Sequence, residues 1–238
     1  ELGELEQALD EYVHFRASQP DNLEAAEALV REKAAACHFE GEIDEGEDFS
    51  DYAAALHNYV TDIKNMQIRT GLHILGRAPE GERLIDFVCA LVRMEHGGEA
   101  SLVRLIAAQA GYDYEALLTH SERMTADGMT YGRKLDAIES EMRAIIAFLA
   151  ERDYTTEAAE AAMVLPVIAA ARAESRAAFS HALREITENI VPRLQKTEQE
   201  ITGTLRALTG RYIEPSAAGA PTTNGTDVLP TGRNFYGL

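Results

Sequence analysis

The sequence predicts an all-α protein, a multi-helix domain followed by an irregular C-terminal tail rich in proline and glycine. Over most of residues 1–209, apolar residues recur at spacings of three and four, which is the pattern of amphipathic helices. No stretch of strand length alternates apolar and polar residues with enrichment in β-branched side chains. From Gly210 onward the composition changes, because residues 210–238 contain three of the seven prolines and five of the seventeen glycines.

The first three helices are predicted within residues 1–66. The segment LEQALDEYVHF has apolar residues close to helical spacing, and Pro20 and Asp21 then end this helix and cap the next, NLEAAEALVREKAAACHF. An acidic run with two glycines at residues 40–48 predicts a solvated loop. The third helix, capped by Ser50 or Asp51, has one apolar stripe: Tyr52, Leu56, Tyr59, Ile63 and Met66.

The middle of the chain is predicted to contain a segment with weak helix-forming tendency, followed by four helices. In QIRTGLHILG, Gly71 and Gly76 weaken the helix, and Pro79 ends the linker after it. GERLIDFVCALVRMEHGG predicts a helix that stops at its two glycines, SLVRLIAAQAG predicts a shorter one, and Asp113 caps another. Residues 131–150 then carry a regular stripe: Leu135, Ile138, Met142, Ile145 and Leu149.

A very long helical stretch is predicted from Thr156 to Leu208. Pro166 and Pro192 lie inside it, and each should kink or divide it because proline lacks the backbone N–H and crowds the preceding turn. The last part of the stretch is expected to keep one continuous apolar face: Leu183, Ile186, Ile190, Leu194, Ile201, Leu205 and Leu208.

Two parts of the chain are therefore predicted, a helical domain at residues 1–209 and an irregular tail at residues 210–238. The chain begins on Glu1 and finishes on apolar and aromatic residues without a polar end. We expect it to be a segment of a longer protein, with the tail leading into a downstream region.

The charge balance argues against several classes of partner. Lys and Arg number 22 against 40 Asp and Glu, giving a net charge of −18, which repels nucleic-acid phosphates. No apolar run approaches the roughly 18 to 20 residues that span a bilayer, and no secretory signal is visible. Cys37 and Cys89 are too few for a disulfide framework, so two reduced thiols in a cytoplasmic protein are expected.

Common catalytic motifs are absent from these 238 residues. The sequence has no phosphate-binding G-x-x-x-x-G-K-[ST] loop, no G-x-S-x-G elbow and no H-E-x-x-H zinc motif. Glu11 and His14 form a single Glu-x-x-His pair, whereas a carboxylate-bridged di-metal bundle needs that pair twice with two further glutamates. No catalytic residue and no metal ligand is predicted here.

The tail is the part of the chain where an anionic ligand would be repelled least. From Gly210 onward, Arg211 and Arg233 balance Glu214 and Asp227. Arginine presents a planar fork that suits carboxylates, and loops with glycine and proline can turn backbone N–H groups toward a ligand. On composition alone, a linker to another domain is the alternative interpretation.

Three stretches carry a resemblance to a known family: KNMQIRTGLHILG (64–76), EITENIVPRLQKTEQEITGTLRALTG (185–210) and the tail (210–238), which contains LPTGRNFYG. They closely resemble the large subunit of cobaltochelatase, which is similar in turn to the large subunit of magnesium chelatase. The order and spacing agree over most of the chain. In the magnesium branch Ile-His usually follows the Gly-Arg-Asn, so Phe235-Tyr236 favours the cobalt branch.

This resemblance implies a metal chelatase, a ligase that inserts Co2+ into a corrin ring in cobalamin biosynthesis. The large subunit would bind the tetrapyrrole, while AAA+ partner subunits of a multi-subunit complex would hydrolyse ATP with Mg2+, in keeping with the missing phosphate-binding loop. The family's His-Gly-Thr stretch, the candidate for metal-insertion chemistry, is not in this chain. The segment alone is therefore expected to be inactive.

The resemblance also implies substrate contacts at two places, which we expect to share one cleft. Polar groups of both places would contact ring carboxylates or amides: Gln67, Arg69, His73, Arg211, Arg233 and Asn234. Aromatic residues of the tail would stack on the ring: Tyr212, Phe235 and Tyr236. The alternatives are a polar residue at a fraying helix end for His73 and ordinary packing for Tyr212.

Two other functions stay open at this point. The metal could be Mg2+ and the ring a porphyrin, as in magnesium chelatase. Alternatively, the segment could be a non-catalytic helical scaffold whose charge of −18 presents an acidic face to partner subunits.

Overall fold

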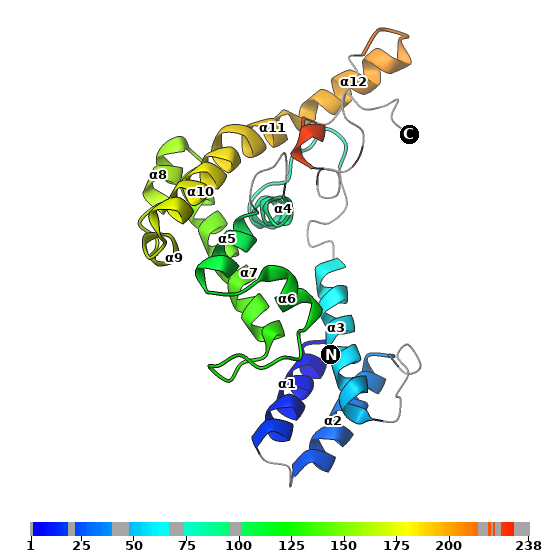
Figure 1. Cartoon of the computed structure of the whole chain (residues 1–238). Coiled ribbons are helices and arrows are strands. Elements are labelled where there is room, and N and C mark those ends of the chain that lie inside the picture. The colour runs from blue at the N-terminus through cyan, green and yellow to red at the C-terminus, as the bar shows by residue number, and fades with distance from the viewer. Residues whose placement is uncertain are drawn as a thin grey trace. The chain divides into compact units, whose positions relative to one another are not determined.

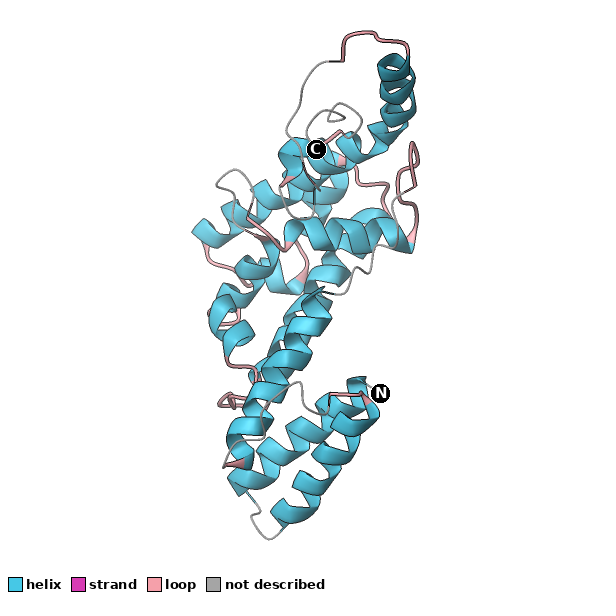
Figure 2. Ribbon diagram, turned by 90° about the vertical axis from the view of Figure 1, so that its right-hand side faces the viewer, coloured by secondary structure: helices cyan, strands magenta, loops and turns pink. Residues whose placement is uncertain are grey.

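The structure is a computed structural model that describes residues 2–18, 22–39, 48–66, 74–95, 101–213, 219, 221 and 225–230. Throughout these ranges the regular elements are helices, and no β-strand is present (Figures 1 and 2). Two isolated β-bridges pair Ile74 with Arg77 and Met124 with Thr130. The predicted all-α class is confirmed.

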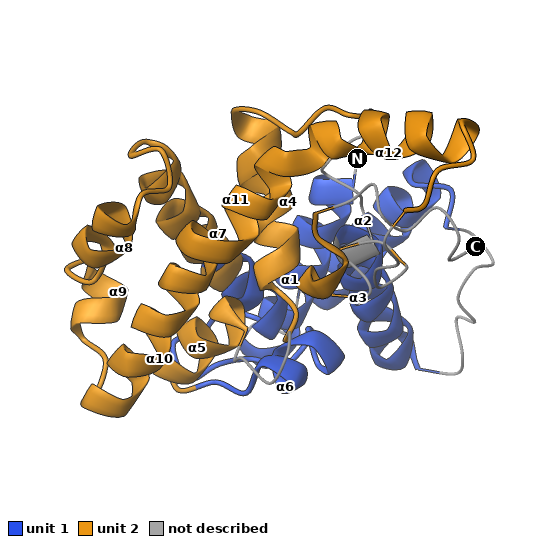
Figure 3. Cartoon of the chain, turned by 90° about the horizontal axis from the view of Figure 1, so that it is seen from above, with its two compact units in different colours: residues 1–67, 112–137 blue, residues 68–111, 138–238 orange. Residues whose placement is uncertain are grey.

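The chain divides into two compact units (Figure 3). The first contains Glu1–Gln67 and Tyr112–Ala137, and the second contains Ile68–Gly111 and Ile138–Leu238. Helix α7 (Tyr131–Ala150) has residues in both units. The division predicted between residues 209 and 210 stays a prediction.

The first unit is built on three helices, α1 (Leu2–Ser18), α2 (Leu23–Ala36) and α3 (Phe49–Met66), with the short α6 (Tyr114–Thr119) beside α3. Helix α1 packs along α2 and also contacts α3. The core is formed by fully buried aliphatic side chains from all three: Leu5, Leu9, Val30, Leu56 and Val60. Burial of such a side chain stabilises the fold by roughly 1.5 to 3 kcal/mol.

The second unit gathers α4 (Glu82–Val92), α5 (Leu102–Gln109), α8 (Thr156–Ala162), α9 (Pro166–Ala169) and α10 (Ala173–Arg184). Helix α10 contacts α5, α8 and α9. The predicted α7 stripe is buried throughout, with exposures of 0 to 4% along Leu135, Ile138, Met142, Ile145 and Leu149.

Local capping signals are only partly as predicted. Asp113 caps α6, since its carboxylate accepts the N–H of Ala116 at 2.8 Å. The prediction that Ser50 or Asp51 caps α3 is wrong, because α3 begins at Phe49 and Asp48 accepts the N–H of Ser50 at 2.9 Å. Asp48, the residue directly before α3, thus satisfies a free N–H group of the first turn in place of Ser50 or Asp51.

The long stretch after residue 156 is interrupted where its prolines predict. Pro166 starts α9 as a separate short helix. Pro192 lies in α11 (Val191–Leu194), directly after a π-helical turn over Glu185–Ile190. The wider π turn accommodates the proline, which cannot donate a hydrogen bond to the carbonyl four residues earlier.

A 3₁₀ turn at Gln195–Glu198 then precedes α12 (Gln199–Leu208). A 3₁₀ turn advances about 120° per residue and an α-helix about 100°, so four such residues rotate the faces of the next helix by about 80°. The first part of the predicted apolar face is buried, at Leu183, Ile186, Ile190 and Leu194. The last part is exposed, at Ile201, Leu205 and Leu208, so the prediction of one continuous face is wrong.

Candidate functional site

The candidate site lies in the second unit, where a tight turn meets the start of α12. Ile74 and Arg77 close this turn, the N–H of Arg77 donating to the carbonyl of Ile74 at 3.1 Å. Gly76 has φ +73°, and a Cβ there would lie 2.4 Å from two side-chain carbons of Ile201. Only glycine combines this backbone conformation with so close an approach to the helix.

Glu200 fixes the turn to α12 by a charge-assisted hydrogen bond. Glu200 is 4% exposed, and its Oε2 accepts a hydrogen bond from the N–H of Gly76 at 2.7 Å. The carboxylate also lies in the first turn of α12, where the helix dipole favours a negative charge. The sequence signal for this contact is weak, since Glu200 is one of 40 acidic residues.

Helix α12 ends in a left-handed cap that directs the chain into the tail. Gly210 has φ +69°, and its N–H donates to the carbonyl of Ala207 at 3.0 Å. The N–H of Arg211 donates to the carbonyl of Arg206 at 3.0 Å, which completes a Schellman motif. Arg211 and the 80% exposed Tyr212 therefore project immediately after the helix.

The tail is anchored by part of its apolar content. Ile213, Val228 and Leu229 are 9%, 1% and 2% exposed, and a 3₁₀ turn spans Thr226–Val228. These three side chains are packed, whereas the ring of Tyr212 is exposed. The alternative of ordinary packing for Tyr212 is therefore wrong within the described residues.

Most of the predicted substrate contacts lie outside the described residues: Gln67, Arg69, His73, Arg233, Asn234, Phe235 and Tyr236. Of the predicted set, the structure shows Arg211 and Tyr212, both exposed at the end of α12. The turn that contacts α12 begins at Ile74, directly after His73 in the sequence. Gly76 and Glu200, which make that contact, were not predicted as site residues.

The residues that follow Glu200 carry positive charge, in contrast to the net charge of the whole chain. Residues 201–213 contain Arg206 and Arg211 and no acidic residue, although the whole chain has a net charge of −18. Both arginines are exposed. The surface of α12 therefore combines exposed aliphatic groups with positive charge.

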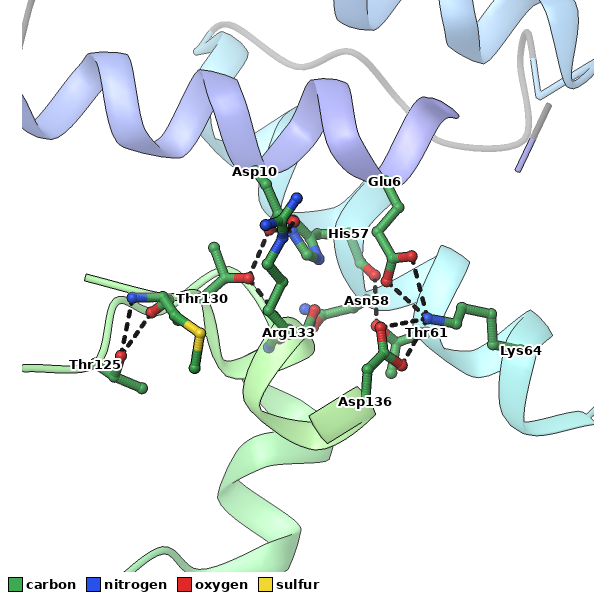
Figure 4. Close-up of polar contacts among 12 residues, drawn as sticks. Glu6, Asp10, His57, Asn58, Thr61, Lys64, Thr125, Thr130, Arg133 and Asp136 are labelled. Carbon is green, nitrogen blue, oxygen red and sulfur yellow. Dashed lines mark hydrogen bonds and ion pairs between the residues drawn. The ribbon is translucent and has the colours of Figure 1, made fainter. Parts of the chain in front are cut away.

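A second polar cluster lies in the first unit and centres on Asp10 of α1 (Figure 4). Asp10 is 9% exposed and accepts hydrogen bonds from Thr130 Oγ1 and Arg133 Nε, each at 2.5 Å, while His57 Nε2 lies 3.3 Å from its Oδ1. Burial raises the pKa of Asp10, but hydrogen bonds from His57, Thr130 and Arg133 outweigh it, so the pKa is lowered overall.

Lys64 of α3 extends this cluster by bridging two carboxylates (Figure 4). Its Nζ lies 2.8 Å from Glu6 Oε1 and 2.7 Å from Asp136 Oδ1. Burial lowers the pKa of Lys64, but its bonds to Asp136 and Glu6 raise it overall. Because each of these acids is engaged by a cation, the cluster serves to hold α1, α3 and the start of α7 together.

The second unit has a further set of polar groups between α4 and α7. Arg143 pairs with Glu82 at 2.5 Å and with Asp86 at 3.2 Å. Burial raises the pKa of Cys89 to about 11, so its thiol is protonated near neutral pH. Neither Cys37 nor Cys89 is in a disulfide.

The described part of the chain contains neither a metal-binding cluster nor a membrane-spanning helix. Across the described ranges, no group of three or more His, Cys, Asp or Glu side chains could hold a metal ion. Within those same ranges, no helix has the length and apolar content needed to cross a membrane.

Comparison with known proteins assigns the chain to a family. The CobN/Magnesium Chelatase family matches residues 1–238, and the chain belongs to this family. It is 32% identical to the aerobic cobaltochelatase subunit CobN of a Sinorhizobium species over 256 residues, covering 100% of this chain and 20% of that protein. It is 29% identical to the subunit of the same name from Pseudomonas aeruginosa, covering 100% of this chain and 19% of that protein.

A solved structure agrees with these relatives. The catalytic subunit of cobaltochelatase from Mycobacterium tuberculosis matches with a TM-score of 0.72 and 29% identity, over 99% of this chain and 19% of that one. The chain therefore spans about a fifth of the length of the relatives that it matches. The resemblance stated from LPTGRNFYG and its companion stretches is confirmed.

Proposed function

We propose that this chain is part of the large, tetrapyrrole-binding subunit of an ATP-dependent cobaltochelatase that inserts Co2+ into a corrin ring during cobalamin biosynthesis. Cobalt is the substrate metal in this proposal. Support comes from the family match over residues 1–238 and from relatives described as cobaltochelatase subunits. The enzyme would be a cytoplasmic ligase that forms metal–nitrogen bonds.

One structural observation supports placing substrate contacts in this segment. Gly76 donates to Glu200 at 2.7 Å and lies against Ile201, which attaches the end of the Gln67–Gly76 stretch to α12. The same helix ends at the exposed Arg211 and Tyr212. The turn at Gly76 is therefore attached to the start of α12, and Arg211 and Tyr212 follow the end of the same helix.

The chemical roles proposed for this region are binding and orientation. Arg211, together with Arg69 and Arg233, would pair with peripheral carboxylates of the ring. Tyr212 offers an exposed aromatic face on which the macrocycle can stack. Holding the ring still favours metal entry, because a fixed geometry removes the entropy cost of aligning the ring as its pyrrole protons leave.

ATP hydrolysis is assigned in this proposal to AAA+ partner subunits, which would use ATP with Mg2+. The supporting observation is that residues 1–238 contain no phosphate-binding loop motif. A second candidate keeps the site and changes the substrate pair to Mg2+ and a porphyrin, because the family description includes magnesium chelatase.

Titration of the complete subunit with a corrin and with a porphyrin, followed by ring absorbance, tests the proposal. We expect the corrin spectrum to shift on binding, and Arg211→Ala to weaken binding by about tenfold, the effect of losing roughly 1.4 kcal/mol. Arg172→Ala removes another exposed arginine, at the start of α10, and should leave binding unchanged.

Two results would contradict the proposal. Absence of any absorbance change with either ring would remove the tetrapyrrole-binding role. Binding and Mg2+ insertion with the porphyrin alone, measured in the complete complex, would establish the second candidate instead.

A further inference from the structure

The outer face of α12 carries an uncovered aliphatic stripe. Ile201, Leu205 and Leu208 are 48%, 59% and 79% exposed. Their spacing of four and three residues, at about 100° per residue, places them within about 60° of one another around the helix. Isolated exposed leucines are ordinary on protein surfaces, but an aligned series forms a continuous apolar surface.

The opposite face of α12 is already occupied within the second unit. Glu200 is buried there and binds the turn at Gly76, and Gly203 is buried as well. Ile74 and Leu75 of that turn are 51% and 54% exposed, and Ile201, the first residue of the stripe, lies against Gly76. Helix α12 thus has one packed face and one open aliphatic face.

The spacing and charge of this open face identify the kind of partner that fits it. Apolar residues separated by four and three positions form the seam by which one helix packs against another. Arg206 follows Leu205 by one position, about 100° around the helix, and residues 201–213 contain no acid. A complementary helix would therefore have an apolar stripe flanked by acidic side chains.

We infer that the Ile201–Leu205–Leu208 face of α12 is a docking surface for an amphipathic helix with acidic flanks, supplied by the remainder of the same subunit. The matched segment is only 19 to 20% of the relatives' length, so most of their polypeptide lies outside it. A helix in the same polypeptide docks at high effective concentration and covers the stripe permanently. This inference goes beyond the proposed function, because the docking involves neither ring nor metal.

Cysteine labelling of the full-length subunit tests the inference. Leu208→Cys and Leu205→Cys place thiols on the stripe, and Val164→Cys places a control thiol at a residue that is 77% exposed between α8 and α9. A maleimide is added and modification is followed by peptide mass spectrometry, which separates these thiols from Cys37 and Cys89. We expect the two stripe thiols to react at least about tenfold more slowly than the control, as a local opening free energy above about 1.4 kcal/mol requires.

The charge component is tested by reversing one arginine. In the Leu208→Cys protein, Arg206→Glu should raise the labelling rate at position 208 toward that of the Val164→Cys control, because it repels the acidic flank. Arg172→Glu makes the same change of charge at the start of α10 and should leave the rate low. Equal effects of the two reversals would contradict the acidic flank.

Three outcomes would overturn the docking itself. Stripe thiols that label as fast as the control in the full-length subunit show that nothing in that subunit covers α12. Protection that arises only after partner subunits are added assigns the surface to another chain. Protection that arises only with a tetrapyrrole assigns it to the substrate, and ring absorbance, measured separately, reports whether the proposed function still holds.

Discussion

Gly76→Ala tests the contact that joins the turn to α12. The structure implies two costs. A non-glycine residue at φ +73° is strained by roughly 1 to 2 kcal/mol. The added methyl would also lie 2.4 Å from Ile201 Cγ1 and Cδ1, and overpacking of this kind costs roughly 1 to 3 kcal/mol. Since Ile201 is 48% exposed and can rotate away, we expect a total near the lower end, about 2 to 3 kcal/mol.

Hydrogen exchange of the complete subunit measures this effect locally. The amide of Gly76 is bonded to Glu200, so its exchange reports opening of the turn. The alanine that replaces Gly76 should exchange about 30- to 150-fold faster, because each 1.4 kcal/mol changes an equilibrium tenfold.

Gly210→Ala provides the matched control. Gly210 has φ +69°, but a Cβ there meets nothing within 4 Å, so its substitution carries the conformational cost alone. The Gly76→Ala/Ile201→Ala protein lacks the clash. Its protection from hydrogen exchange at position 76 should therefore recover in part, to the level expected when only the backbone strain at positive φ remains. If Ile201→Ala gives no recovery, or if the two glycine substitutions loosen their own sites equally, the packing explanation is refuted.

Three further predictions concern groups away from the turn. Asp10→Asn should lower the free energy of unfolding of the first unit by about 1 to 3 kcal/mol, because it weakens the bond to Arg133. The pKa of Asp10 is lowered in the fold, so the stability that its carboxylate contributes is present above about pH 4 and is lost as the pH falls through the folded pKa. Acid titration followed by circular dichroism would show this loss. Cys89, with its pKa raised to about 11, should react with iodoacetamide at a rate that rises about tenfold per pH unit between pH 7 and 10, and a rate independent of pH would contradict this. Leu149→Ala should cost about 2 to 5 kcal/mol, since Leu149 is fully buried, while Val164→Ala at 77% exposure should stay within about 0.5 kcal/mol, both measured by denaturant unfolding.

Much of the fold is determined by signals that act within one or two helical turns. The spacing of Leu135, Ile138 and Met142 predicted α7, and all three side chains are buried. Gly210 ends α12 because the cap requires a residue that tolerates positive φ. The cap is closed by the N–H of Gly210, which donates to Ala207, and the N–H of Arg211, which donates to Arg206. Such features depend on neighbours in the sequence, so the sequence alone is sufficient to predict them.

The candidate site could be found only from the sequence motifs and the tertiary contacts together. LPTGRNFYG and its companion stretches led to the family, and the family led to Arg211 and Tyr212. Gly76 and Glu200 are 124 positions apart in the sequence, and no periodic pattern over that distance predicts their hydrogen bond. It exists because the fold of the second unit brings a free backbone N–H beside a carboxylate that has been turned inward.

The tertiary structure also decided which face of α12 is open. The spacing of apolar residues predicted that the face containing Leu183 and Ile190 continues through Ile201 and Leu208. The 3₁₀ turn at Gln195–Glu198 rotated the last two turns by about 80°, burying Glu200 and exposing the aliphatic residues. A helical face can be predicted from sequence while the helix keeps one period, but a short change of period shifts its phase, and packing against distant residues determines where that change occurs.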